Sequence, residues 1–490
     1  MALWQSKPKV QVKTGNNSEP ITLDGGLNRH GTIFNIGKNE AWDCINTTSK
    51  VNGALSVRPA DTDKITKIPD GTSQFSDVHG ILGINSYVIN YEPSAGVAII
   101  NLLVNDPDNP TQYYVLRWNP PSNMFWSKSY PLTSDKESTI ITLQTGTDEY
   151  TIVCNTQGVY ETHDGDEELP QGYNQISNAP KTHIYTVDDN RLFALEGNKL
   201  SWCDPTDITN WTTGESGNIT ITEMRGEGSA LITMNDAVYC FSGRSLHILY
   251  GDDTGNYALS NTIDVGCVGF RALAKYNDSI YFLDYDGLKV YSNGVINSIS
   301  DKISYWIKNP LYSNLLSKAA MAINEDYLYL SLRSSTPNMD ITVELNLKTG
   351  VFNLWDEAYN AFTKSGKILY GVKAKGTGLV EIGTKTNHSK EWYYETPMKF
   401  LGFNKQIVSS IPIVVDLPIG STLKLAFNTN PNTPSWKDIY TFISSSNVQR
   451  VVVDIPMTDL NNVDWYQLKL SGTGPCIVHY MGTDERVRIR

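Results

Sequence analysis

A short unit of turn residues followed by aromatic or β-branched residues recurs through the middle of the chain. In its clearest copy, 277–294, Asn277-Asp278 precedes an apolar run, Asp286-Gly287 reverses the chain tightly, and Asn293-Gly294 turns it again. Markers of the unit lie at residues 148, 190, 236, 278, 326 and 366, which are 42, 46, 42, 48 and 40 residues apart. Repeats of roughly 40 to 50 residues with about four short strands each are typical of a β-propeller. The sequence therefore predicts a propeller of six or seven blades over residues 66–386.

The second half of the unit places glycine shortly before a returning strand, at Gly197, Gly243 and Gly287. Asn85–Val88 is interpreted as a diverged first copy. A sandwich of irregular hairpins is the alternative architecture, but the near-constant period favours the propeller. The aromatic residues of the clearest copy, expected to pack between blades, are Tyr281, Phe282 and Tyr285.

One segment breaks the strand pattern. Ile299, Ile303, Trp306 and Ile307 recur at the spacing of one helix face. Ser300 is a candidate for the cap at the start, and Pro310 lies beyond the end. A short helix is therefore expected within the repeats.

The two flanks of the repeats differ from the middle. Residues 1–65 comprise a polar N-terminal arm and a loop-rich segment, and the arm is either flexible or ordered on a neighbouring subunit. Residues 387–490 alternate between apolar and polar positions and predict a separate C-terminal β-sandwich. Its expected strands are 411–416, 422–427, 448–455, 466–470 and 477–481.

Composition supports an all-β class and bounds the partners. The 490 residues include 27 Tyr and 11 Trp but only 19% charged residues, and a chain of this length exceeds one ordinary core. The formal charge of −12 argues against tight nucleic-acid binding, which needs clustered Lys and Arg. The six cysteines lie far apart and are expected to be free, buried thiols. Neither a signal peptide nor a run of membrane-spanning length is evident, so a soluble chain made in the cytosol is expected.

No constellation of residues predicts an enzyme, and we assign no catalytic, cofactor-binding or metal-ligating residue. The acidic loop His163–Pro170 lacks the spacing of a calcium-binding EF-hand and is interpreted as solvated. Asp252-Asp253 is one of many carboxylate pairs, and sequence does not single it out as a glycosidase pair. The seven histidines are scattered. The ending Arg486–Arg490 fits either a blunted sheet edge or a contact with an acidic partner.

Residues 23–60 carry an ordered set of motifs: Gly25-Gly26-Leu27-Asn28, Asn39-Glu40-Ala41, Asn46, Gly53-Ala54-Leu55 and Arg58-Pro59. This order resembles the start of many virion proteins of tailed bacteriophages, in which it precedes a β-propeller. Later motifs also resemble that family: Arg191-Leu192-Phe193 with Leu200–Pro205 and Trp211, Gly266–Gly269 with Ile280–Leu283 and Gly287-Leu288, and the ending Trp465–Pro475. The family is the tail hub or nozzle protein of short-tailed phages, also described as a packaged-DNA stabilisation or head-completion protein.

The resemblance implies a structural role in the virion tail after assembly in the host cytoplasm. It implies a homo-oligomeric ring, usually a hexamer, below the portal and its adaptor protein. Such a ring extends the DNA channel, retains packaged DNA and carries tail fibres or spikes, and it neither inserts into membranes nor binds genomic DNA sequence-specifically. The negative net charge suggests an acidic lumen along which DNA slides without sticking. The N-terminal arm and the C-terminal sandwich are the candidate contact surfaces.

Two other functions remain open. A host-surface glycan-binding or glycan-cleaving propeller would be favoured by exposed Trp clusters and paired carboxyls in one pocket. An intracellular scaffold propeller is the third possibility, but it leaves the motifs of residues 23–60 without an explanation.

Overall fold

The computed structural model describes most of the chain in two compact units. The described residues are 17–65, 67–69, 78–81, 88–94, 97–105, 113–120, 124–128, 137–145, 148–163, 174–188, 190–251, 256–336, 338–375, 378–401, 406–457, 460 and 463–487. One unit comprises 1–59, 351–354 and 386–490, and the other comprises 60–350 and 355–385. Strands dominate both units, which confirms the predicted all-β class.

The larger unit is a β-propeller. Its described strands form seven four-stranded antiparallel sheets, here numbered as blades 1 to 7. Blades 1 to 4 contain β8 (Val88–Ser94), β9 (Val97–Asn105), β10 (Tyr113–Asn119) and β11 (Met124–Lys128); β12 (Thr139–Thr145), β13 (Asp148–Cys154), β14 (Val159–His163) and β15 (Asn174–Gln175); β16 (Tyr185–Asp188), β17 (Arg191–Glu196), β18 (Lys199–Trp202) and β19 (Gly217–Thr220); and β20 (Gly228–Met234), β21 (Ala237–Ser242), β22 (Leu246–Tyr250) and β23 (Ala258–Leu259).

Blades 5 to 7 follow the same plan. They contain β24 (Leu273–Tyr276), β25 (Ser279–Asp284), β26 (Gly287–Ser292) and β27 (Val295–Ser298); β28 (Ala320–Asn324), β29 (Tyr327–Leu332), β30 (Ile341–Asn346) and β31 (Val351–Trp355); and β32 (Tyr359–Ser365), β33 (Ile368–Lys373), β34 (Leu379–Lys385) and β5 (Ala60–Ile65). A further two-stranded sheet pairs β6 (Lys67–Pro69) with β7 (Val78–Ile81).

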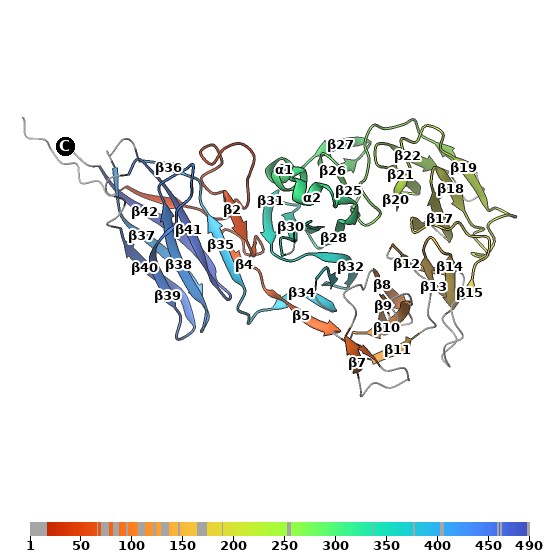
Figure 1. Cartoon of the computed structure of the whole chain (residues 1–490), viewed down its shortest axis with the longest axis horizontal. Coiled ribbons are helices and arrows are strands. Elements are labelled where there is room, and N and C mark those ends of the chain that lie inside the picture. Colours follow the sequence, from red (N-terminus) through yellow and green to blue (C-terminus); the bar gives the residue numbers. More distant parts are fainter. Residues whose placement is uncertain are drawn as a thin grey trace, which may run out of the picture. The chain divides into compact units, whose positions relative to one another are not determined.

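The blades surround a common centre (Figure 1). The first strand of each blade contacts the first strand of the next, and β32 of blade 7 contacts β8 of blade 1, so the circle is complete. Blade 7 takes its outer strand, β5, from the N-terminal side of the repeats. We expected residues 60–65 to belong to the N-terminal segment, but in the structure they close the propeller.

The sequence markers fall at the turn between the first and second strands of a blade. Asn235-Asp236, Asn277, Glu325 and Gly366 each adopt a positive φ there, between 50° and 59°. Asn, Asp and Gly tolerate this left-handed conformation better than other residues, which explains why the turns are visible in the sequence. Residues 85–87 of the presumed first copy lie outside the described part, and Val88 begins an inner strand.

The hairpin 277–294 forms as predicted, with Ser279 opposite Ser292 and Asp284 opposite Gly287. Asn293 and Gly294 have φ values of 50° and 79°, as a tight turn requires. Gly287 has a different role from the one expected. A Cβ at this position would overlap Oγ of Ser300, which accepts a 2.9 Å hydrogen bond from the amide of Leu288.

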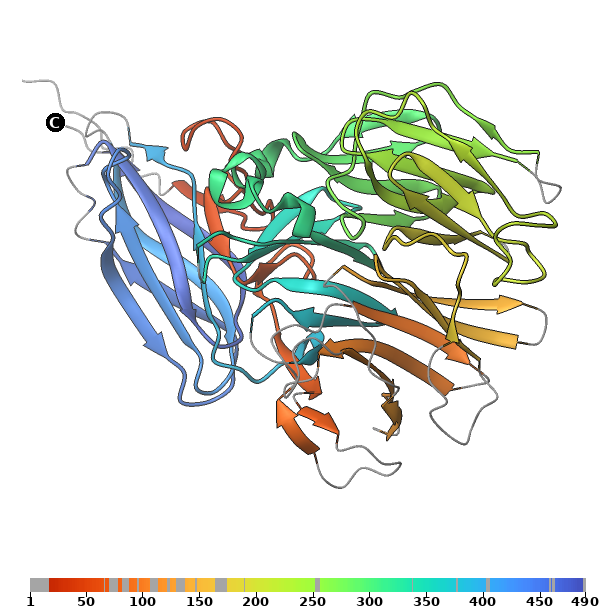
Figure 2. The same cartoon turned by 45° about the vertical axis from the view of Figure 1, so that its right-hand side comes forward.

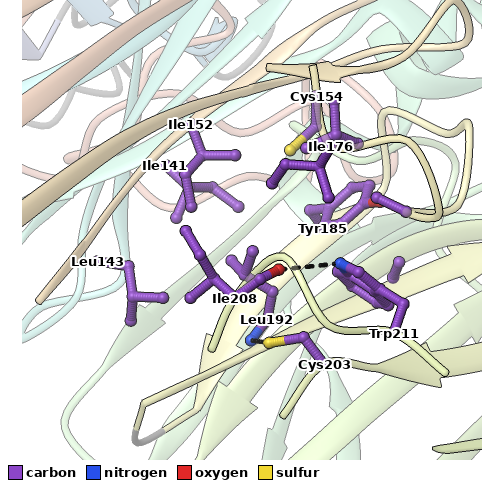
Figure 3. Close-up of a cluster of buried hydrophobic side chains, with 13 residues drawn as sticks. Ile141, Leu143, Ile152, Cys154, Ile176, Tyr185, Leu192, Cys203, Ile208 and Trp211 are labelled. Atoms are coloured by element: carbon purple, nitrogen blue, oxygen red, sulfur yellow. Dashed lines mark hydrogen bonds between the residues drawn. The ribbon is translucent and has the colours of Figure 1, made fainter. Parts of the chain in front are cut away.

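Buried side chains between neighbouring blades form the core. Figure 3 shows one such cluster, between blades 2 and 3, with Ile152 and Leu192 fully buried in it. Phe241 and Phe282 make the equivalent contact between blades 4 and 5, with ring centroids 5.1 Å apart. Tyr285 is 55% exposed, so the expectation that it packs between blades is wrong.

The expected helix is divided into short pieces. These are η1 (Asp301–Ile303), α1 (Ser304–Lys308), α2 (Pro310–Ser313) and η2 (Leu316–Lys318). Ile303, Trp306 and Ile307 are buried as predicted. Ser300 makes no cap, because its hydroxyl serves the strand β26, and α2 is capped by Asn309, whose side chain accepts from the amide of Leu311.

The smaller unit is a β-sandwich of two six-stranded sheets. One runs β3-β4-β42-β37-β40, with β1 also on β42, and the other runs β2-β35-β41-β38-β39, with β36 also on β41. Figure 2 shows the two layers, blue strands with red ones from the N-terminal segment. The strands are β1 (Asn17–Ile21), β2 (Asp43–Ile45), β3 (Thr47–Thr48), β4 (Leu55–Val57), β35 (Glu391–Glu395), β36 (Lys399–Phe400), β37 (Gln406–Leu417), β38 (Thr422–Asn428), β39 (Lys437–Ile443), β40 (Val448–Pro456), β41 (Trp465–Thr473) and β42 (Ile477–Val487). The predicted sandwich is thus present, and the N-terminal segment completes both of its sheets.

No helix in the described residues is long and apolar enough to cross a membrane. All six cysteines are free and buried, as predicted.

Candidate functional site

A cavity of about 200 Å³ lies where the inner strands of the propeller begin. Described residues from blades 2 to 7 line it, because first strands converge on the centre of a propeller. Its lining residues are Ser138, Thr139, Ile140, Ile184, Tyr185, Leu231, Phe270, Arg271, Leu273, Ala320, Met321, Ala361 and Phe362. We call this cavity the channel mouth.

Arg271 spans the channel mouth. Its Nη2 donates a 3.0 Å hydrogen bond to the carbonyl oxygen of Ser138, so the start of blade 5 is tied to the start of blade 2. The guanidinium also stacks on Phe270, 4.6 Å from the ring centroid, and Phe270 contacts the His183 ring at 4.5 Å. Blades 3 and 4 separate the joined blades, so the side chain crosses the opening.

The polar groups of the channel mouth serve to join blades by hydrogen bonds. Its volume is below the roughly 300–1,000 Å³ of ordinary ligand pockets. The lining residues offer one cation, a few hydroxyls and apolar walls, and none of these residues is a carboxylate. The described lining residues thus present one guanidinium, three hydroxyls and apolar side chains.

Polar bonds also join the blades at the other ends of the inner strands. The Thr233 hydroxyl donates to the carbonyl of Val187, and Lys275 donates to the carbonyl of Thr233. In the next blades, Tyr276 donates a 2.6 Å hydrogen bond to Asp326. Hydrogen bonds from Lys348 and then from Tyr276 lower the pKa of Asp326. These contacts hold successive blades in register.

The first phage-like motif is built into the sandwich unit as a close backbone crossing. A Cβ on Gly25 would lie 2.6 Å from the carbonyl oxygen of Asn39. Gly26 has φ +64°, and a Cβ there would overlap the carbonyl of Phe352. Only glycine satisfies both the close approach and the positive φ. The fully buried Leu27 follows, with its amide bonded to the same Phe352 carbonyl at 2.7 Å.

The second motif, Asn39-Glu40-Ala41, holds this crossing together with hydrogen bonds. Asn28 Nδ2 donates to Glu40 Oε2 at 2.7 Å, and the same oxygen accepts from the amide of Gly37 at 2.6 Å. The backbone of Ala41 bonds both to Gly26 and to Asn28. A Gly-Gly-Leu-Asn segment followed by Asn-Glu-Ala is therefore one structural element, whose two halves lie side by side.

Asn46 and Arg58 complete the node. Asn46 is fully buried with φ 56°, its Nδ2 donates to the carbonyl of Glu391 at 2.8 Å, and its carbonyl accepts from the amide of Arg58 at 2.9 Å. Arg58 is 1% exposed. We call the residues 25–28, 37–41, 46 and 58 the N-terminal node.

A carboxylate pair on the sandwich was not foreseen from sequence. Asp43 of β2 lies directly opposite Glu395 of β35, a placement that repels like charges. Arg29 compensates Asp43 at 3.0 Å, and Lys469 compensates Glu395 at 3.1 Å. Burial raises the pKa of both carboxyls, and the nearby cations oppose this rise.

Aromatic rings border the carboxylate pair. The Lys469 ammonium lies 4.3 Å from the Tyr393 ring centroid and 5.3 Å from that of Trp436. Arg29 stacks on Trp42 at 4.2 Å. These residues are brought together by the strand register, so no local sequence motif predicted the pair.

Several candidates from the sequence lie wholly or partly outside the described residues. These are 164–170 of the acidic loop, Asp252-Asp253 and 488–490 of the basic ending. Among the described residues, no group of three His, Cys, Asp or Glu side chains is placed to hold a metal ion. No described tryptophan side chain is exposed.

Comparisons with known proteins give only distant likenesses to solved structures. No protein-family model matches the chain, and neither does any curated protein. The WD40 domain of Pan2 from Neurospora crassa is 10% identical over 61% of this chain and 89% of that chain, with a TM-score of 0.38. The AfRom2 CNH domain is 9% identical over 55% of this chain and 90% of that chain, with a TM-score of 0.32.

PorZ, an essential surface component of the type-IX secretion system of Porphyromonas gingivalis, is 11% identical, with a TM-score of 0.39. The match covers 82% of this chain and 60% of that chain. At these values the likenesses carry no argument about function. The assignment of a propeller rests on the seven sheets and their closed circle.

Proposed function

We propose that this chain is a structural virion protein of a tailed phage that forms a ring-shaped tail hub or nozzle. Six copies surround a channel below the portal and its adaptor, help to retain packaged DNA and carry fibres or spikes. The genome passes through this channel during ejection without sequence-specific contacts. The protein acts by assembly and has no catalytic role.

The N-terminal node is the observation that carries the proposal. Three of the phage-like motifs, Gly25–Asn28, Asn39–Ala41 and Asn46, meet in this node together with Arg58, and each makes a specific contact there. The same local fold requires a glycine at position 26, the Asn28–Glu40 hydrogen bond and a buried asparagine at position 46. A match in the order of such residues therefore supports a shared architecture, from which we infer the shared role.

The channel mouth bears on where DNA would pass. Arg271 and Ser138 cross the centre of the propeller, and the cavity there holds about 200 Å³. A duplex whose major groove alone is about 12 Å wide cannot pass such an opening. Under this proposal the DNA channel therefore lies between copies of the chain, as in a ring, and not through the propeller.

Electron microscopy of the purified chain and of virions tests this proposal. We expect closed rings with an open centre in solution, and density for the propeller and sandwich at the tail below the portal. A chain that stays monomeric at high concentration and is absent from the virion tail contradicts the proposal. A lumen lined by Lys and Arg would leave the ring intact but refute the acidic channel.

The carboxylate pair supports a second candidate, binding of a host-surface glycan. Lys469, the ion-pair partner of Glu395, lies over the rings of Tyr393 and Trp436, and sugars bind to aromatic faces and carboxylates. A glycan array with wild-type protein and the variants Asp43→Asn and Glu395→Gln tests it. Binding that the variants lose would favour this role, and an array without binding would remove it.

A further inference from the structure

The last strand of one sandwich sheet, β40, has an uncovered edge. Among the described strands β40 pairs only with β37, and it ends the sheet order. Gln449, Arg450, Val451 and Val452 are all exposed, and Val452 is 63% exposed. Proteins usually protect such an edge with lysine, proline, a bulge or a covering segment, because free backbone groups invite another strand. In β40 a bulge at Arg450 and Pro456 stand at the two ends of the exposed stretch, and the regular strand between them is left open.

The two faces of β40 differ in composition. Val451, Val453 and Ile455 lie opposite the buried Val415, Ile413 and Ile411 of β37 and belong to the core side. The alternate positions form an outward row of Arg450, Val452 and Asp454. The row thus carries a cation, an apolar side chain and an anion, in that order.

We propose that β40 pairs antiparallel with β40 of a second copy of this chain, centred on Val452. In this register Arg450 of each copy lies opposite Asp454 of the other, and the two Val452 side chains face each other. Opposite charges and β-branched pairs both favour cross-strand pairing. The outward row is therefore complementary to itself.

The charges of the row are available for this contact. Within the described part of the chain neither Arg450 nor Asp454 has an ion pair within 4 Å, and the Arg450 charge acts only at longer range on Asp416, where it helps to lower the pKa of that carboxyl. The Arg450 amide is held on the inner side by a 2.6 Å hydrogen bond to Asp416 Oδ1, and Asp416 is fixed in turn by His479 at 2.7 Å. The bulge at Arg450, with φ 47°, is thus anchored to β37.

A two-fold contact of this kind closes after two copies and cannot build a ring. The β40 contact is therefore separate from the ring interface of the proposed function, and the inference does not rest on that function. It joins the sandwich sheets of two copies into one continuous sheet.

A cysteine at the two-fold axis tests the register directly. All six native cysteines are buried, so Val452→Cys supplies the accessible thiol. In the proposed register it lies opposite the same thiol of the second copy. We expect mild oxidation to yield a disulfide-linked dimer. Val295→Cys is the matched control, since Val295 is a 55% exposed valine on the strand β27 of the propeller, and it should remain uncrosslinked.

A charge exchange tests the complementarity. Size-exclusion chromatography with light scattering should give a species of twice the 54.6 kDa chain mass, or an even multiple if rings also form. Arg450→Asp and Asp454→Arg should each weaken this pairing roughly ten-fold, because each places like charges opposite one another twice. The double variant should restore it. Circular dichroism confirms that each variant is folded.

Different results would refute the β40 pairing and the proposed function. A ring of copies in which Val452→Cys does not crosslink overturns the β40 pairing and leaves the ring standing. Crosslinking of Val452→Cys in a protein that forms no ring supports the β40 pairing and contradicts the proposed function. If removal of residues 1–16 abolishes pairing while the charge variants leave it unchanged, the N-terminal arm occupies the edge and self-pairing is wrong.

Discussion

The Tyr359 hydroxyl donates a 2.6 Å hydrogen bond to Asp61 Oδ2 and thereby fastens β5 to the first strand of blade 7. Asp61 Oδ1 accepts a 3.0 Å hydrogen bond from the amide of Gly383, 322 residues away in sequence. Asp61 is 8% exposed and Tyr359 is fully buried. One carboxylate thus satisfies a buried hydroxyl and a partly buried amide at the seam of the propeller.

Asp61→Ala should open this seam. The Tyr359 hydroxyl would keep only Glu357 Oε2, at 3.3 Å, and the partly buried Gly383 amide would lose Asp61 as its acceptor. A buried donor left without an acceptor costs about 1–3 kcal/mol, so we expect a loss of about 1–2 kcal/mol from the local opening free energy. Hydrogen exchange of the β5 and β34 amides measures it. The control is Lys64→Ala, which removes only the partly exposed ion pair with Glu381 and should cost less than about 1 kcal/mol. Equal exchange in both variants would contradict the role of Asp61.

Gly287→Ala should destabilise blade 5. The new methyl group would overlap the Ser300 hydroxyl, and crowding of this kind costs about 1–3 kcal/mol. Gly243→Ala is the control, because its Cβ would meet nothing nearer than Tyr285 at 3.4 Å. Thermal unfolding should show a lower midpoint for the first variant only. Adding Ser300→Ala to Gly287→Ala should recover part of the loss.

Acid should weaken the propeller through His247. This residue is 2% exposed in β22, and burial lowers its pKa below the ordinary 6.5, although Glu223 acts in the opposite direction. The unfolded chain therefore binds the proton more readily, so the stabilisation is present above about pH 6.5 and is lost as the pH falls towards the folded-state pKa.

Urea unfolding at pH 7.5 and pH 5.5 measures this effect. His247→Gln should reduce the difference between the two free energies of unfolding. His30→Gln, which changes an exposed histidine, should leave the difference as it is in the wild type. A pH dependence unaltered by His247→Gln would show that another group is responsible.

The thiols should be unreactive in the folded chain. Burial raises the pKa of Cys203 to about 11 and those of Cys44 and Cys267 to about 12, and the thiolate is the reactive form. Titration with a disulfide reagent at pH 8 should detect less than one fast thiol per chain. All six should react in guanidinium. A fast thiol in the native protein would reveal an opening not seen in the structure.

Two N-terminal deletions should distinguish the role of residues 1–16 from the role of the strand β1. Removing residues 1–22 eliminates β1 and uncovers Met481–Glu485 of β42, whereas removing 1–16 leaves β1 paired. If the arm makes the ring or adaptor contacts, both deletions should impair assembly, measured by electron microscopy and adaptor pull-down. Unchanged assembly after either deletion refutes this role of the arm.

Local chemistry made the repeats predictable. Left-handed turns select Asn, Asp and Gly, and inter-blade packing selects aromatic residues, so both leave a periodic mark. The seam strand β5 left no such mark, because Ala60–Ile65 contains few apolar residues and its partner lies in β34. Its assignment required the long-range register.

The candidate sites were less predictable for the same reason. The Arg271–Ser138 tie and the Asp43–Glu395 pair arise from closure and strand register, which no short motif encodes. The motifs of the N-terminal node were recognised in the sequence, but their physical meaning, a glycine-dependent backbone crossing, came only from the structure.

Both units are completed by pairing early residues with late ones, β5 with β34 and β1 and β4 with β42. A ribosome releases the early strands long before their partners exist, and such distant pairing is slow because the intervening chain must be closed first. The propeller therefore cannot reach its final form before β34 has left the ribosome, and the sandwich cannot do so before β42 has. A chain interrupted before these strands would expose unpaired strand edges and should be removed by proteolysis before it enters assembly.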